Sequence, residues 1–236
     1  MAISGKLNGF TLKLIACITM IIDHFAVLFL DFGSKTYMFS RIIGRISFPL
    51  FAFLLIEGFF HSSNLKKYII RLAILAIISE PFFDYFLIRA QLKENFSVWY
   101  SQNVVFTLLL GLVTVCVYDI IVRRFHTQPV LCNLYCVLIL LCGTMTSFFL
   151  RTDYSVYGVL LIFIMYLFHK NRLWMMMACA ANILLFGTGM IQLFAMTGVF
   201  LIWFYNGEEG KKIQRVFYLF YPLHIVILGT LHMLIK

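Results

Sequence analysis

Two adjacent ionisable residues, Asp23 and His24, lie inside the first apolar stretch of the chain, Phe10 to Leu30. A helix of this length, rising about 1.5 Å per residue, crosses a hydrocarbon core of roughly 30 Å and places both residues near its middle or just beyond it. A charge there costs on the order of 3 kcal/mol, so both side chains must face protein or water. We interpret the pair as functional, although a buried Asp paired with an Arg, next to a core His, would also fit the pattern.

Three later segments place further polar side chains in or beside apolar runs. The two arginines of the first segment are four residues apart, as are the two acids of the second, so each pair shares a helix face. Acidic residues should be rare within membrane spans, and their presence there is a functional hypothesis by default. The residues are Arg41, Arg45 and Glu57, then Glu80 and Asp84, then Asn103.

A network of ion pairs between these arginines and acids would hold several helices together without any chemistry. Such a network leaves His24 unexplained, as well as the concentration of acids within the spans. Titratable groups gathered around a polar cavity are the arrangement expected of a catalytic site. On a helix, Asp23 and His24 point about 100° apart, so we expect Asp23 to pair with an arginine rather than with His24.

The composition identifies the elements that must position these residues. Of 236 residues, 62% are apolar and 12% charged, which is far from soluble usage and predicts an all-α polytopic membrane protein. No cleavable signal peptide is expected, and residues 1–236 read as a single integral membrane domain. About nine transmembrane helices are expected, several of them short or kinked. Their ranges are 10–30, 42–60, 68–88, 100–121, 130–149, 154–168, 173–187, 189–205 and 215–234.

Loop charge sets the expected orientation. The loops after spans two, four, six and eight carry ten Lys and Arg residues, against five in the other loops. By the positive-inside rule the first set is cytoplasmic, as is the N-terminus, and Lys236 is outside. This places Asp23 and His24 at mid-to-outer depth in a cell membrane. Arg45, Glu80, Asp84 and Asn103 are expected at about the same level on the next three spans.

The last apolar run contains the segment YPLH. Pro222 is expected to kink or open this helix in its inner half, between Tyr221 and His224. Packing around a proline kink and a functional role account for His224 equally well.

The segments ITMIIDH, RIIGRISFPLFAFLLIEGFF, ISEPFFD and NVVFTLLLGL, followed by YPLH, resemble the TraX family. That family is named for the membrane protein that acetylates the N-terminus of conjugative pilin. It is similar in outline to transmembrane acyltransferases that take an acetyl group from cytosolic acetyl-CoA and deliver it across the membrane. The resemblance is close over nearly the first half and the last span, whereas residues 125–205 match mainly in hydropathy and length.

The resemblance implies an acetyl-CoA-dependent acetyltransferase in which His24 is catalytic. His24 would act as general base or carry the acetyl group. Arg45 or Asn103 would stabilise the oxyanion, and Glu80 and Asp84 would hold a cationic amine or orient His24. The implied catalytic residues are His24, Asp23, Glu80, Asp84, Arg45 and Asn103.

Acetyl-CoA would meet basic and aromatic residues, because its phosphates prefer Lys and Arg. The same basic residues would equally serve as topology determinants alone. The candidates are Arg41, Lys13, Lys66, Lys67, Arg71, Tyr221 and His224. The six cysteines form no CxxC pair, so no metal is expected.

The expected partners are membrane lipid, acetyl-CoA and an extracytoplasmic acceptor such as a protein N-terminus, a glycan or a small amine. The basic residues are dispersed over short loops, which argues against nucleic acid. The sequence does not indicate an oligomeric state. The alternative function is a proton-coupled secondary transporter with an Asp, His and Glu relay. A non-catalytic scaffold would not need charges within its spans.

Overall fold

A computed structural model describes residues 5–92, 100–211 and 214–235, and it is all-α over these ranges. Lys93, Lys212 and Lys236, used above to assign loop charge and orientation, lie outside the described residues. The elements are α1 (Gly9–Phe29), α2 (Lys35–Gly44), α3 (Ser47–His61), α4 (Leu65–Phe82), η1 (Phe83–Ile88), α5 (Arg89–Leu92), α6 (Val104–Arg124), α7 (Pro129–Phe149), α8 (Ser155–Leu167), α9 (Arg172–Phe186), η3 (Met190–Phe194), α10 (Ala195–Ile202) and α11 (Gln214–Ile235).

The all-α membrane fold is confirmed, but the prediction of nine spans was wrong. Within the described residues, five segments are long and apolar enough to cross a membrane: α1, α2 with α3, α6, α7 and α11. The shorter apolar helices α8, α9 and η3 with α10 reach about 20 Å each at 1.5 Å per residue, less than the hydrocarbon thickness. They pack on one another and on α3 and α6 instead. Helix α4 is long enough, but it carries several charged residues.

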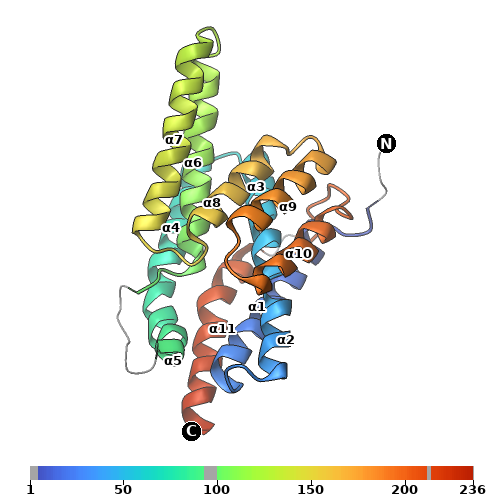
Figure 1. Cartoon of the computed structure of the whole chain (residues 1–236), viewed down its shortest axis with the longest axis vertical. Coiled ribbons are helices and arrows are strands. Elements are labelled where there is room, and N and C mark those ends of the chain that lie inside the picture. Colours follow the sequence, from blue (N-terminus) through green and yellow to red (C-terminus); the bar gives the residue numbers. More distant parts are fainter. Residues whose placement is uncertain (1–4, 93–99, 212–213, 236) are drawn as a thin grey trace.

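Helix α1 contacts α2, α3, α11 and η1. Figure 1 shows α1, α2 and α11 side by side near the C-terminal end, with α8, α9 and α10 stacked above them. The α6–α7 hairpin extends away from this group, and α7 exposes large apolar side chains such as Val130 and Phe149. An apolar helix with few protein neighbours is suited to contact with lipid.

The second span is broken into two helices, α2 and α3. Helix α2 ends at Gly44 and α3 begins at Ser47, so Arg45 lies at the junction. Pro49 then occupies the first turn of α3, where its missing N–H would have had no helical partner. The break turns the arginine side chains of this junction toward α1.

A second irregularity follows Pro81 in α4. Pro81 lacks the N–H that would bond to the carbonyl of Ile77, and a π-helical turn, Phe83–Ile88, follows directly. This turn buries Asp84 and Leu87 against α1 and α11.

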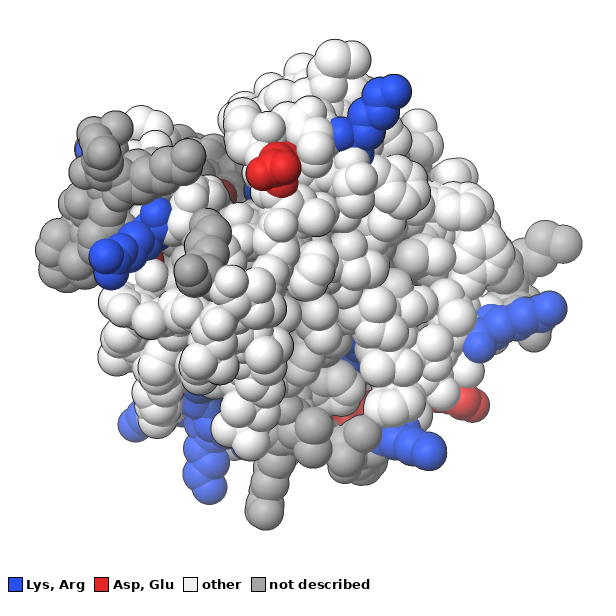
Figure 2. All heavy atoms as spheres, turned by 90° about the horizontal axis from the view of Figure 1, so that it is seen from below, with Lys and Arg blue, Asp and Glu red and all other residues white. Residues whose placement is uncertain are grey.

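Figure 2 views the molecule from the end at which α2, α5 and the C-terminus lie. This face is largely uncharged, and Lys and Arg side chains protrude from it at separate places rather than as one patch. This scattered distribution of Lys and Arg is compatible with a surface in contact with lipid and with the membrane interface.

The predicted orientation can be tested at the two ends of the second span. Asp31 and Ser63 are exposed and flank the α2–α3 segment. In a cysteine-free background, we expect Asp31→Cys to react with a membrane-impermeant maleimide added to intact cells. Ser63→Cys should react only after permeabilisation, because Lys66, Lys67 and Arg71 follow it. Labelling of Ser63→Cys from outside would invert the topology.

Candidate active site

Two arginines clamp the carboxylate of Asp23. Nη1 of Arg41 donates to Oδ2 at 2.6 Å, and Nη2 of Arg45 donates to Oδ1 at 3.0 Å. Asp23 is 7% exposed, so the pairs are largely shielded from water. The expectation that Asp23 pairs with an arginine rather than with His24 is confirmed. Charged hydrogen bonds in such surroundings are both strong and costly to break.

Gly44 makes this clamp possible. A Cβ atom at Gly44 would lie 2.0 Å from Oδ1 of Asp23. Only glycine therefore lets the α2 backbone approach α1 closely enough for both guanidinium groups to reach the carboxylate.

His24 faces His224 of α11 across the helix interface. Nδ1 of His24 lies 2.8 Å from Nε2 of His224, and the ring planes differ by 9°. Nδ1 of His224 lies 2.9 Å from the carbonyl oxygen of Phe220. The structure thus brings two histidines together that are 200 residues apart in the sequence.

A small cavity of about 140 Å³ adjoins His24. Its walls include Asp23, His24, Arg41, Arg45 and Tyr154. The ring of Tyr154 stacks on Phe48 with 3.7 Å between ring centres, and the guanidinium of Arg45 lies 6.0 Å from the Tyr154 ring centre. These contacts hold Arg45 at the cavity wall while it binds Asp23. Nothing in the sequence had singled out Tyr154.

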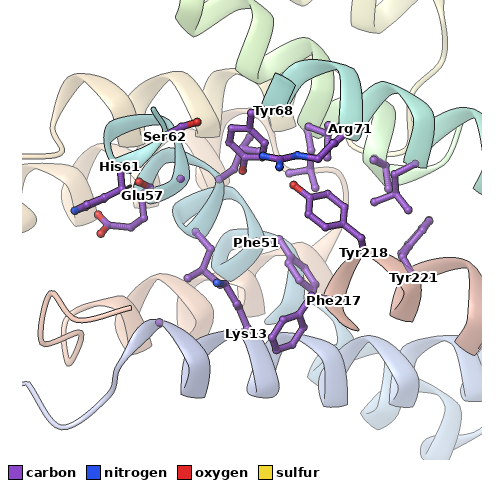
Figure 3. A pocket seen from close by; sticks show the side chains of 18 of the residues that line it. Lys13, Phe51, Glu57, His61, Ser62, Tyr68, Arg71, Phe217, Tyr218 and Tyr221 are labelled. Atoms are coloured by element: carbon purple, nitrogen blue, oxygen red, sulfur yellow. Dashed lines mark hydrogen bonds between the residues drawn. The ribbon is translucent and has the colours of Figure 1, made fainter. Parts of the chain in front are cut away.

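A larger cavity of about 590 Å³ lies along the first half of α1. Figure 3 shows Lys13 and Arg71 on its walls, Phe217 and Tyr218 beside them, Glu57 and His61 at one end and Tyr221 at the other. Its volume falls in the range of cofactor-sized sites. The lining is mostly apolar and carries two cations, Lys13 and Arg71, and two acids, Glu57 and Glu209. The part of the cavity between Lys13 and Arg71 suits a ligand group that carries negative charge.

The two cavities share wall residues. Met20, Phe51 and Val104 line both of them. Lys13 lines the larger cavity and His24 the smaller, about 16 Å apart along α1 at 1.5 Å per residue. Under the predicted topology the larger cavity lies toward the cytoplasm and the smaller toward the outside.

Glu80, Asp84 and Asn103 form a separate group and line neither cavity. Oε2 of Glu80 accepts from the backbone N–H of Asn103 at 3.0 Å and from its Nδ2 at 2.5 Å. Nδ2 also donates to the carbonyl of Ala76 at 2.9 Å, so the amide of Asn103 joins α4 to the start of α6. Asp84 is 4% exposed, and among the described residues no group hydrogen-bonds its carboxylate. A catalytic role for Glu80, Asp84 and Asn103 stays a prediction.

The residues predicted to bind acetyl-CoA fall into four places. Lys13, Arg71 and Tyr221 line the larger cavity. Arg41 lines the smaller one, and His224 lies beside His24. Lys66 and Lys67 are exposed and line neither cavity. Among the described residues, no three His, Cys, Asp or Glu side chains are grouped so as to hold a metal ion.

The end of the larger cavity at which Glu57 lies holds a polar group that the sequence interpretation missed. Glu57 accepts from Nε2 of His169 at 2.6 Å and from the hydroxyl of Tyr205 at 3.0 Å. Burial and then the Glu57 carboxylate raise the pKa of Tyr205, which keeps its hydroxyl protonated as a donor. Glu57 had been noted as an acid within a span, but its partners lie in loops more than 100 residues away.

A family model described as TraX protein matches residues 8–232. The chain is also similar to the probable fimbrial assembly protein FimC, serogroup H1, of Dichelobacter nodosus. The two are 32% identical over 252 residues, covering 97% of each chain. No solved structure matches the chain.

Proposed function

The chain belongs to the TraX family, and from this premise we propose that it is an integral membrane acetyltransferase. It would take the acetyl group of cytosolic acetyl-CoA and transfer it to an amine or hydroxyl acceptor on the extracytoplasmic side. One observation carries the proposal: a large cavity with cations and a small cavity with His24 meet at Met20, Phe51 and Val104. Two substrates entering from opposite sides would meet at that wall.

The larger cavity suits acetyl-CoA. Lys13 and Arg71 offer positive charge for the phosphates, and the rings of Phe217 and Tyr218 lie within 6 Å of these cations. The narrow pantetheine arm would follow the apolar lining toward Met20 and bring the thioester close to the small cavity. The donor acts as a substrate, and the residues named here would only bind and orient it.

The chemistry at His24 is general-base catalysis. His24 takes a proton from the acceptor amine or hydroxyl, whose lone pair then attacks the thioester carbonyl. As the new C–N or C–O bond forms and the C–S bond breaks, the proton passes from His24 to the departing CoA thiolate. Arg45, held at the cavity wall, offers N–H groups to the developing oxyanion.

The FimC relative is named for fimbrial assembly, which favours a protein subunit of a surface fibre as acceptor. The small cavity is open to an N-terminal amine or a hydroxyl rather than to a folded domain, because its volume is only about 140 Å³.

Purified protein in detergent or liposomes should convert labelled acetyl-CoA to free CoA and, when a peptide amine is supplied, to acetyl-peptide. Saturable acetyl-CoA binding should accompany this turnover. Uptake of a solute driven by a proton gradient, without binding or cleavage of acetyl-CoA, would instead favour the transporter. Absence of both activities would contradict both functions.

Arg71 provides a prediction with a matched control. Arg71→Gln removes a cation from the larger cavity, whereas Lys67→Gln removes one from the exposed surface of the same helix. We expect Arg71→Gln to raise KM for acetyl-CoA about 10-fold, the effect of losing a charged hydrogen bond of roughly 1.5 kcal/mol, with kcat nearly unchanged. Lys67→Gln should leave both constants unchanged. Equal effects of the two variants would mean that the phosphates bind elsewhere.

A further inference from the structure

Two successive hydrogen bonds connect the Phe220 carbonyl, His224 and His24 at the contact of α1 with α11. The carbonyl oxygen of Phe220 is 2.9 Å from Nδ1 of His224, and Nε2 of His224 is 2.8 Å from Nδ1 of His24. The imidazole rings are nearly parallel, at 9°, with 4.9 Å between their centres. His24 in turn lines the small cavity.

The acceptor at the far end determines where the hydrogens are. A carbonyl oxygen can only accept, so Nδ1 of His224 carries a hydrogen and donates it to Phe220. A neutral His224 then has a lone pair on Nε2, which accepts from Nδ1–H of His24. His24 is thereby held as the tautomer whose Nε2 carries the lone pair, the form that a general base needs.

The surroundings of His224 fix its ring. Its side chain is 6% exposed, and it stacks on the ring of Phe220 with 4.7 Å between centres and 9° between planes. Tyr221 contacts it from another direction, at 5.6 Å between centres. A ring packed in this way cannot turn to another orientation without disturbing its neighbours, so it orients the ring of His24.

The usual partner for a catalytic histidine is a carboxylate, but no carboxylate of the described residues is hydrogen-bonded to His24. Asp23, the nearest acid in sequence, is bound by Arg41 and Arg45. A neutral imidazole provides an acceptor without an additional negative charge. When His24 takes up a proton next to two guanidinium groups, sharing Nδ1–H with His224 stabilises the imidazolium.

We propose that His224 is a positioning residue, which sets the tautomer and ring orientation of His24 through a relay that ends at the Phe220 carbonyl. The inference rests on the proposed acetyltransferase function for its kinetic consequence. It assigns His224 to the chemistry at the small cavity rather than to the binding of acetyl-CoA.

Two substitutions separate the relay from packing. His224→Phe keeps a planar ring without an acceptor, whereas His224→Gln keeps an oxygen that His24 can reach. We expect His224→Phe to lower kcat about 10–100-fold, the usual effect of removing the partner of a functional histidine, with KM for acetyl-CoA within about twofold. His224→Gln should recover much of the rate. In a His24→Ala background, His224→Phe should cause little further loss, because the relay acts through His24.

His232→Phe, on the same helix, is the matched control and should leave the rate unchanged. Full activity of His224→Phe, or a raised KM with unchanged kcat, would overturn the proposal. So would equal losses in the wild-type and His24→Ala backgrounds, which indicate a purely structural role.

A spectroscopic readout keeps this test independent of enzymatic activity. In protein labelled with ¹⁵N-histidine, His24 should show a protonated Nδ1 and an unprotonated Nε2, and His224→Phe should remove this preference. If the wild-type protein shows this tautomer but transfers no acetyl group, the hydrogen-bonded pair of His24 and His224 is supported and the acetyltransferase function is contradicted. Wild-type protein that transfers acetyl with His24 protonated on Nε2 would overturn the relay alone.

Discussion

We expect His24→Ala to lower the rate of acetyl transfer by about 10²–10⁴-fold, the contribution of a general base, while acetyl-CoA binding persists. The physical reason is the position of the side chain. His24 lines the small cavity, whereas Lys13 and Arg71, which would hold the donor, line the larger one. The measurements are turnover of labelled acetyl-CoA with a supplied amine, and equilibrium binding of acetyl-CoA to the same preparation.

The size of the loss also separates two mechanisms. If His24 carries the acetyl group on its ring, its removal abolishes turnover rather than slowing it, because no covalent intermediate forms. Rapid quenching of the wild-type protein with labelled acetyl-CoA should then show a transient acetyl-histidine. Direct transfer predicts no labelled protein and a residual rate.

His126→Ala is the matched control, because His126 is an exposed histidine at the tip of the α6–α7 hairpin, bonded to the carbonyl of Arg123. It should behave as wild type. Near-normal transfer by His24→Ala, together with an inactive His224→Phe, would move the chemistry to α11 and overturn the assignment.

The pairing of Asp23 was predictable from the sequence because charge and depth left few choices. An acid in the middle of a span needs a nearby cation, and Arg41 and Arg45 were the cations expected at that depth. The structure adds what a linear pattern does not contain, namely that one carboxylate accepts from both arginines and that Gly44 leaves room for it.

Depth alone did not predict which side chains share a cavity. Glu80 and Asn103 were expected near His24 because their spans place them at one level. The structure bonds them to each other at the contact of α4 with α6, and they line neither of the two cavities. Rotation of a helix about its axis depends on packing against its neighbours, and spans without a strong polar face carry little information about it.

The prediction of nine transmembrane spans was wrong for a related reason. Hydropathy finds apolar runs, but a run such as Ser155–Leu167 is equally compatible with a short helix buried between others. Val159, Leu161 and Ile162 of α8 are fully buried against protein. The contact of His24 with His224 likewise depends on two segments 200 residues apart, and no local pattern reports it.

The second large effect is expected at Asp23, on stability. Asp23→Ala leaves two guanidinium groups without their shared carboxylate, and their side chains are only 22% and 15% exposed. Breaking a buried pair in this way costs roughly 3–5 kcal/mol, so we expect much less folded protein in the membrane and a lower unfolding temperature in detergent. Arg45→Ala should cost less, because Arg41 still neutralises Asp23.

Replacing Arg45 by lysine separates its effect on the stability of the protein from its effect on the rate of acetyl transfer. Arg45→Lys keeps the charge beside Asp23 but lacks the planar fork, so it should restore folding better than the rate of transfer. Arg123→Ala is the control. It breaks the pair with Asp119 at 2.9 Å, in which Arg123 is 76% exposed, and pairs of this kind contribute about 0–1 kcal/mol. If Asp23→Ala were as stable as Arg123→Ala, the clamp would not hold α1 to α2. If Arg45→Lys were fully active, the guanidinium fork would have no part in stabilising the oxyanion.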